Sequence, residues 1–275
     1  MAEEQRSGVV ITFFSTASAV GKTLISINMA AELSRQGYSV CLADFDLQFG
    51  DVANYLHMQG ATTVYNVWRR LEGNEDFSLP EIISKYTYNN VQFGVLAAPE
   101  ELSQAYNFKA DMAIKIIKRL RMCYDYVIVD TTSMFSVLNL ALLDLSTIIT
   151  FLGVVDFVPT IKNMKIGNET LQSLNYDANK IRLVLNRSDS ATQISIREVE
   201  TKTLGSPFYH VLSNDFQAAN ESIRSGVPLV LRNNNNLLTR DLRQLVALYT
   251  NRTYQEEEIF DEPEPKSGWL SKLFS

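Results

Sequence analysis

The chain of 275 residues has little cysteine and no long apolar run. Its two cysteines, Cys41 and Cys123, each lie in or beside an apolar segment and lack the spacing of metal ligands. That placement favours buried free thiols in a reducing compartment over a disulfide framework or a zinc site. Residues 1–6 are polar, and no stretch reaches the roughly eighteen apolar residues of a spanning helix, so neither a signal peptide nor a membrane span is predicted. We therefore expect a cytoplasmic protein.

An excess of positive charge is also missing, because the formal net charge is -6. Such a balance disfavours nucleic acid as a partner, since bulk DNA binding depends on neutralising phosphates. The basic residues that do cluster are at helical spacing, which is typical of a solvated helix face. They are Lys115, Lys118, Arg119 and Arg121. With 46% hydrophobic residues, the chain can bury one large core.

Short β-branched or aromatic runs alternate with longer helical patterns. The expected strands are 9–14, 39–44, 91–96, 126–130, 147–152 and 181–185. The expected helices are 22–36, 63–71, 108–122, 138–145 and 160–174, followed by 194–203, 215–224 and 238–249. This alternation predicts an α/β fold of the phosphate-loop kind, with a mostly parallel twisted sheet and helices on both faces. Ligands of such sheets bind at the edge where the strands end.

The segment 15–23 lies between the first expected strand and the first expected helix, and it reads Ser-Thr-Ala-Ser-Ala-Val-Gly-Lys-Thr. It departs from the pattern G-x-x-x-x-G-K-[ST] at the first glycine, where Thr16 stands. A strand, a turn of small residues and a helix start together point backbone N–H groups at an anion. Lys22 can reach outer phosphates and the Thr23 hydroxyl can ligate magnesium. The segment therefore predicts a phosphate-binding loop.

Two further strands end in carboxylates. Asp44 and Asp46 would share a face in a continuing strand, where they could position magnesium-bound or attacking water. Taken alone, the pair is better explained by a turn in which Asp makes local hydrogen bonds. Asp130 closes the apolar strand 126–130, which has the shape of the second magnesium-side motif of phosphate-loop proteins. Three such elements in this order favour a nucleotide site.

Together these elements resemble the ParA/MinD group of deviant phosphate-loop ATPases. The resemblance is strongest to the TadZ/CpaE branch, which is tied to assembly of the Tad (Flp) pilus. It covers roughly residues 8–252 and is carried by 15–23, 42–51, 126–130, 184–187 and 219–229. The string Asp-Leu-Gln-Phe-Gly-Asp at 46–51 is its most branch-specific part.

The resemblance implies ATP or ADP and Mg2+ as cofactors. The residues that it assigns to nucleotide binding are Ala19, Val20, Gly21, Lys22, Thr23, Leu24 and Asn186. Asn186 would contact the adenine. Magnesium would be held by Thr23, Asp46 and Asp130, and Asp46 is the acid implicated in hydrolysis.

Ala17 departs from this pattern, because the resembled family has a signature lysine there that reaches the partner's phosphates across a nucleotide-sandwich dimer. A charged group of that kind contributes on the order of three to five decades in rate where it acts as a finger. We therefore expect ATP hydrolysis to be slow or absent. Residues 131–133 also depart from the proline-containing turn that usually follows the Asp130 position.

The function implied by the resemblance is that of an ATP-binding protein that localises or regulates assembly of an envelope machine, such as a Tad pilus or a secretion system. A homodimer and pilus or secretion-system proteins are the expected partners. Two alternatives stay open: a scaffold that does not hydrolyse ATP, and a cell-division or DNA-partition positioning ATPase of the MinD or ParA kind. Since the first strand begins at about Gly8, we expect the receiver-like domain of the branch to be missing.

The expected organisation is an ATPase domain at 1–252, an acidic linker at 253–268 and a short amphipathic segment at 269–275. If helical, the last segment presents Trp269, Leu270, Leu273 and Phe274 on one face. Such a face suits a membrane surface, so that the protein would lie at the inner face of the membrane or at a cell pole. A motif for a partner protein and a frayed end without a role are the alternatives.

Overall fold

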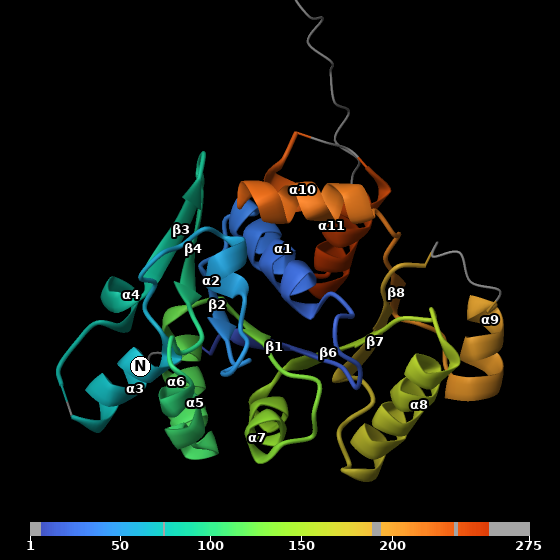
Figure 1. Cartoon of the computed structure of the whole chain (residues 1–275), viewed down its shortest axis with the longest axis horizontal. Coiled ribbons are helices and arrows are strands. Elements are labelled where there is room, and N and C mark those ends of the chain that lie inside the picture. Colours follow the sequence, from blue (N-terminus) through green and yellow to red (C-terminus); the bar gives the residue numbers. More distant parts are fainter. Residues whose placement is uncertain (1–6, 74, 189–193, 234–235, 253–275) are drawn as a thin grey trace, which may run out of the picture.

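The computed structural model describes residues 7–73, 75–188, 194–233 and 236–252, and these form an eight-stranded sheet in the order β3-β4-β2-β5-β1-β6-β7-β8 (Figure 1). The strands are β1 (Val9–Phe14), β2 (Val40–Asp44), β3 (Ser84–Tyr88), β4 (Val91–Leu96), β5 (Tyr126–Asp130), β6 (Ile148–Gly153), β7 (Ile181–Leu185) and β8 (His210–Val211). Neighbouring strands are parallel except for the antiparallel pair β3 and β4. The predicted fold class is confirmed.

Helices cover both faces of this sheet (Figure 1). They are α1 (Lys22–Arg35), α2 (Val52–Tyr55), α3 (Val64–Glu72), α4 (Leu79–Ile82), α5 (Leu102–Asn107), α6 (Ala110–Cys123), α7 (Val137–Leu145), α8 (Val158–Ser173), α9 (Ile196–Glu198), α10 (Phe216–Ser225) and α11 (Leu237–Tyr249). A π-helical turn, η1 (Val199–Leu204), continues α9, and a 3-10 turn, η2 (Leu229–Leu231), follows α10. One face of the sheet carries α1, α10 and α11, and the other carries α3, α6, α7 and α8.

The central strands are apolar throughout because both of their faces are buried. In β1, Ile11 and Phe13 pack into the core beneath α1 and α11, whereas Val10 and Phe14 pack into the cores on the opposite face. A strand buried on both sides reads as a continuous apolar run rather than as an alternation. For this reason the expected strand 9–14 has the bounds that the structure shows.

Two strands were not predicted from the sequence, and both lie at the ends of the sheet order. β3 alternates buried and exposed residues and pairs with β4 through a turn at Asn89, whose φ is 49°. β8 contains only two residues. Edge strands of this kind lack the apolar run that identifies a central strand.

The basic helix α6 has the solvated face that its sequence predicts. Lys115, Lys118 and Arg119 are exposed, and Ile116 and Ile117 are buried in the core. Across the described part of the chain, no helix is long and apolar enough to cross a bilayer. The expected linker at 253–268 and segment at 269–275 lie outside the described residues.

Candidate functional site

The carboxyl ends of β1, β2 and β5 lie side by side and form the centre of the candidate site. β5 is paired with β1 on one side and β2 on the other, so that Asp130 stands beside both Phe13 and Asp44. The loop that follows β1 leads directly into α1. Strand pairing therefore brings together acids and a loop that lie more than a hundred residues apart in sequence, as between Thr23 and Asp130.

The phosphate loop, residues 15–21, ends in a backbone conformation that requires glycine. Gly21 has a φ of 95°, and a Cβ atom there would lie 2.6 Å from Asn186 Nδ2. This explains why Gly21 is present although the first glycine of the usual pattern is replaced by Thr16. In the described structure, α1 has no side-chain hydrogen bond at its N-cap and no acidic residue in its first turn. Its first N–H groups and its positive end are therefore available to an anion.

Thr23 and Asp130 form a buried pair beneath this helix start. The Thr23 hydroxyl donates to Asp130 Oδ2 at 2.6 Å, whereas Oδ1 of the same carboxyl is buried without a hydrogen-bond partner among the described residues. Burial raises the pKa of Asp130 to about 6, against the opposing effects of the Thr23 hydrogen bond and of Lys22. An unpartnered carboxylate oxygen next to a hydroxyl fits the outer coordination of a hard cation such as Mg2+.

Lys22 is the cation of the site. Its Nζ donates to the hydroxyl of Ser133 at 2.8 Å. Burial lowers the pKa of Lys22, and the negative charges of Asp130 and Asp46 oppose that shift. A partly buried ammonium group near two carboxylates can pair with the negative charge of an incoming phosphate.

Asp44 and Asp46 do different things, because β2 ends at Asp44 and the two acids do not share a strand face. Asp44 is buried and accepts hydrogen bonds from the N–H groups of Asp46 (3.0 Å) and Val52 (3.2 Å). Asp44 therefore stabilises the turn after β2 through local hydrogen bonds, which is the explanation that the sequence favoured for this pair of acids taken alone. Asp46 lies beyond the strand, and its Oδ1 accepts from the N–H of Phe49 at 3.4 Å. Burial raises the pKa of the Asp46 carboxyl, and the Phe49 hydrogen bond and the charge of Lys22 partly offset that shift.

Asn186 and Arg187, directly after β7, hold the phosphate loop from its other side. Asn186 Nδ2 donates to the carbonyl oxygen of Val20, and its Oδ1 accepts from the N–H of Arg187, both at 2.9 Å. The guanidinium of Arg187 donates to the carbonyl oxygen of Ala19 at 2.9 Å. A side-chain amide has two N–H donors and an oxygen that can accept two hydrogen bonds, so Asn186 keeps one donor and one acceptor position for a ligand.

A cavity of about 170 Å3 opens next to Asn186. Its lining comprises Gly21, Leu24, Asn186, Arg187, Ser213, Asn214, Asp215, Phe216, Ala219, Asn220, Ile223 and Leu238. Most of the walls come from α10 and the segment before it, and the amide of Asn186 adds a polar edge. A flat heterocycle with hydrogen-bonding edges matches this combination.

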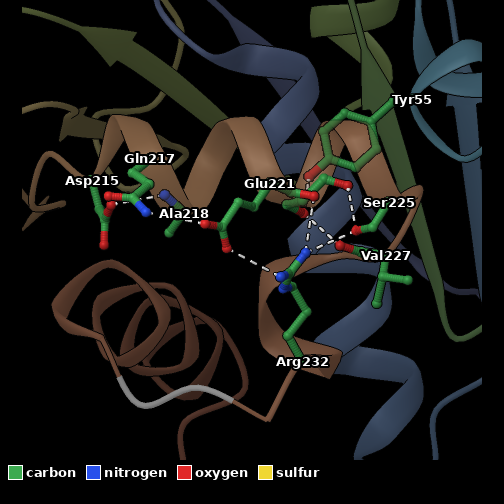
Figure 2. A network of polar contacts seen from close by, with 9 residues as sticks. Tyr55, Asp215, Gln217, Ala218, Glu221, Ser225, Val227 and Arg232 are labelled. Atoms are coloured by element: carbon green, nitrogen blue, oxygen red, sulfur yellow. Dashed lines mark hydrogen bonds and ion pairs between the residues drawn. The ribbon is translucent and has the colours of Figure 1, made fainter.

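The helix α10 that lines this cavity is fastened from behind by a second polar cluster (Figure 2). The Tyr55 hydroxyl of α2 lies 2.6 Å from Ser222 Oγ, and Ser222 donates to the carbonyl oxygen of Val227 at 2.5 Å. At the surface, Arg232 donates to the Glu221 carbonyl oxygen (2.9 Å) and pairs with its carboxylate (3.2 Å). We call this set the α2–α10 cluster.

Another hollow, of about 810 Å3, lies between the turn after β2 and the loop after β4. Phe49, Asp51, His57 and Glu100 are among the residues that line it, and no residue of the phosphate loop does. Its lining includes the acids Asp51 and Glu100 and no lysine or arginine, so it is unfavourable for a phosphate. The smaller cavity beside Asn186 fits the site better.

The structure brings Thr23 and Asp130 into contact, places Lys22 and Asp46 near enough for their charges to act on Asp130, and places Asn186 at the loop. Ser133 and Arg187 also belong to the site, although no role was predicted for them. In the described part of the chain, no three His, Cys, Asp or Glu residues converge as a metal site. A magnesium ion held by Thr23 would therefore need oxygen atoms of the nucleotide and of water to complete its shell. The metal roles of Thr23, Asp46 and Asp130 stay predictions.

The comparisons with known proteins concern the family and the fold of the chain. Residues 11–229 match the domain family described as CobQ/CobB/MinD/ParA nucleotide binding domain. Among solved structures, a ParA family ATPase from Chlorobium tepidum TLS is similar with a TM-score of 0.79 at 20% identity, over 87% of this chain and 99% of that one. No curated protein sequence matches the chain.

Two further solved structures are similar in fold. The septum site-determining protein MinD complexed with Mg-ADP, from Pyrococcus horikoshii OT3, gives a TM-score of 0.73 at 18% identity over 88% of this chain and 96% of that one. MinD in the MinC:MinD cell division protein complex from Aquifex aeolicus gives 0.73 at 16% identity, over 91% and 98%. At these identities the likeness concerns the fold.

Proposed function

Because the chain belongs to the family of CobQ/CobB/MinD/ParA nucleotide-binding domains, we propose that it binds ATP and ADP with Mg2+. One observation carries this proposal: the uncapped start of α1 presents Lys22 and Thr23 beside Asp130, whose Oδ1 has no partner among the described residues. The backbone from Ala19 to Leu24 would surround the phosphates. The structurally similar MinD from Pyrococcus horikoshii OT3 is a complex with Mg-ADP, which supports the choice of ligand.

In this proposal Lys22 binds the outer phosphates, and the Thr23 hydroxyl ligates magnesium while Asp130 orients it from behind. The base enters the cavity beside Asn186, whose amide has one donor and one acceptor left for it. Magnesium supplies charge neutralisation at the phosphates when bound.

Calorimetry with ATP, ADP and AMP, with and without magnesium, tests the proposal. Replacing Lys22 by Ala removes the phosphate-binding charge, and we expect affinity for ATP to fall on the order of a hundredfold, the equivalent of a lost charge-assisted contact. Lys115→Ala, on the exposed face of α6, is the matched control and should bind as the unmodified protein does. Absence of binding at millimolar ATP in the unmodified protein would overturn the proposal.

Hydrolysis is proposed to be slow or absent. Asp46 would orient the attacking water, but Ala17 supplies no cation where the resembled family has its signature lysine. Phosphate release should be measured for the unmodified protein, Asp46→Ala and Lys22→Ala. Release that depends on both residues identifies an ATPase, whereas equal background in all three proteins identifies a nucleotide-binding scaffold.

We propose further that the protein acts as a homodimer. Large apolar side chains are exposed in the loops after three of the central strands: Phe49 after β2, Met134 after β5 and Phe157 after β6 have exposed fractions of 75%, 62% and 67%. Exposed apolar residues gathered at one edge are typical of an interaction surface. Sedimentation with and without ATP tests this, and Phe49→Ser should weaken the dimer; a monomer under all conditions would refute it.

The finer role that we propose is localisation or regulation of an envelope machine such as a Tad pilus or a secretion system, from the cytoplasm or the inner face of the membrane. It rests on the string at 46–51 that resembles the TadZ/CpaE branch. Co-sedimentation with liposomes and with DNA, using the full chain and a chain ending at Pro265, tests it. A pilus adaptor does not need to bind DNA, so ATP-dependent binding of DNA would favour the positioning ATPase. Liposome binding that is lost in the shorter chain would assign membrane contact to the residues after Pro265.

A further inference from the structure

Ser133, in the loop after β5, joins that loop to the phosphate loop. Its hydroxyl donates to the carbonyl oxygen of Ala17 at 2.8 Å and accepts from Lys22 Nζ at 2.8 Å. Ser15 Oγ lies 3.1 Å from Ser133 Oγ. Ser133 is 111 residues from Lys22 in sequence, and the parallel pairing of β1 with β5 brings the two together.

Ser133 cannot easily turn away, because the loop that carries it is held on the opposite side. Asn139 of α7 donates to Thr132 Oγ1 and to the carbonyl oxygen of Met134, both at 2.7 Å. Thr131 donates to the carbonyl oxygen of Phe13 at 2.7 Å, so the loop is tied to β1 as well. The hydroxyl of Ser133 is therefore a fixed acceptor.

A fixed acceptor changes what Lys22 must do to bind a phosphate. A lysine side chain that becomes ordered loses rotamer freedom, and this loss opposes binding. An ammonium group has three donors, and the bond to Ser133 uses one of them, which leaves two for phosphate oxygens. Holding the side chain in place beforehand reduces the ordering cost at the moment of binding.

We propose that Ser133 is a positioning residue that holds Lys22 at the phosphate loop before the ligand arrives and so favours nucleoside di- and triphosphates over monophosphates. The inference rests on the nucleotide binding proposed above. It adds a residue that acts through Lys22, and it assigns the preference to the outer phosphates, which Lys22 reaches. A base or a first phosphate gains nothing from this contact.

Calorimetry on Ser133→Ala with ATP, ADP and AMP tests the proposal. We expect affinity for ATP and ADP to fall about tenfold, the equivalent of one hydrogen bond to a charged group, while affinity for AMP stays unchanged. Ser133→Thr keeps the hydroxyl and should restore the affinity for ATP and ADP. Equal losses for all three nucleotides, or no loss for any, would overturn the proposal.

Ser136→Ala is the matched control within the same loop. Ser136 caps α7 by accepting from the N–H of Asn139 at 3.1 Å. Its substitution removes this cap and leaves the side-chain bonds of Asn139 and the contact between Ser133 and Lys22 in place. We expect Ser136→Ala to bind ATP as the unmodified protein does. If it lost as much affinity as Ser133→Ala, general order of the loop would explain the effect and the positioning role would fall.

A second measurement needs no nucleotide, which separates a failure of this inference from a failure of the proposed function. Reductive methylation of the nucleotide-free protein, followed by peptide mass spectrometry, reports how exposed each lysine amine is. We expect Lys22 to be modified several-fold faster in Ser133→Ala than in Ser133→Thr, with Lys115 on α6 modified at the same rate in both. Equal rates for Lys22 would refute the positioning role whether or not the protein binds ATP.

Discussion

Two polar clusters join distant segments of the chain, and they differ in whether their hydrogen bonds are complete. At the phosphate loop, Asp130 keeps one buried oxygen without a partner among the described residues, and its carboxyl lies near Asp44 and Asp46. In the α2–α10 cluster, Tyr55 and Ser222 are buried too, but no buried side-chain polar atom of that cluster lacks a partner in the described structure (Figure 2). One cluster leaves a position open for a ligand, and the other does not.

The difference separates two uses of buried polar groups. A satisfied group stabilises the fold by a modest amount, whereas an unsatisfied acceptor or a buried like-charge pair costs stability and is retained where function requires it. On this argument the polar groups at the phosphate loop lower the stability of the fold and are retained for ligand binding. The α2–α10 cluster stabilises the position of α10, which lines the cavity. Substitutions in the two clusters should therefore have opposite effects on folding.

The largest expected effect is at Asp130. Because burial raises the pKa of Asp130 from 3.8 to about 6, its ionised form opposes folding above pH 6 and ceases to do so below about pH 4. Asp130→Asn should therefore raise the free energy of unfolding at pH 8 by up to about 3 kcal/mol. The gain should shrink as the pH falls from 6 to 4. Urea unfolding at a series of pH values measures it.

Asp125→Asn is the contrasting variant, because Asp125 directly precedes β5 and Asp130 ends it. The carboxylate of Asp125 accepts from both the N–H (2.8 Å) and the hydroxyl (2.6 Å) of Ser39, so its substitution should give no gain in stability. Asp130→Asn should also lose the magnesium-dependent part of its ATP affinity. A destabilised Asp130→Asn at pH 8 would contradict the idea that this site costs stability.

Much of the fold could be predicted because the central strands are buried on both faces. β1, β4, β5 and β7 have the bounds that the apolar runs predicted. The short helices α2, α4 and α5 were not predicted, since four to six residues carry too little periodicity to be recognised. The π turn η1 was also not predicted, because the sequence pattern of a helix does not distinguish π-helical from α-helical hydrogen bonding.

The site could be predicted in part. Local order along the chain was enough for Lys22, Thr23 and Asp130, because each follows the end of a recognisable strand or starts a helix. The role of Ser133 depends on strand pairing across more than a hundred residues, and an isolated serine in a loop carries no signal of that. The division of labour between Asp44 and Asp46 likewise depends on where β2 stops.

The next effect in size concerns Tyr55. Tyr55→Phe removes the hydroxyl that lies 2.6 Å from Ser222 Oγ, but Ser222 keeps its bond to the carbonyl oxygen of Val227. We expect the free energy of unfolding to fall by about 1 kcal/mol, the usual contribution of one buried hydrogen bond. Urea unfolding measures the loss and calorimetry with ATP should show unchanged affinity. A large loss of ATP affinity would show that the α2–α10 cluster belongs to the site.

The smallest effect is expected where the α2–α10 cluster reaches solvent. Glu221→Gln removes the charge that pairs with Arg232 at 3.2 Å, but Arg232 still donates to the Glu221 carbonyl oxygen and to Ser225 Oγ. An exposed ion pair contributes about 0.2–1 kcal/mol and is screened by salt. The substitution should therefore change the free energy of unfolding by less than about 0.5 kcal/mol at 0.5 M salt. Unfolding of Glu221→Gln at low and high salt measures this. A loss as large as that of Tyr55→Phe, persisting in salt, would mean that the cluster is held together by charge rather than by its buried hydroxyl groups.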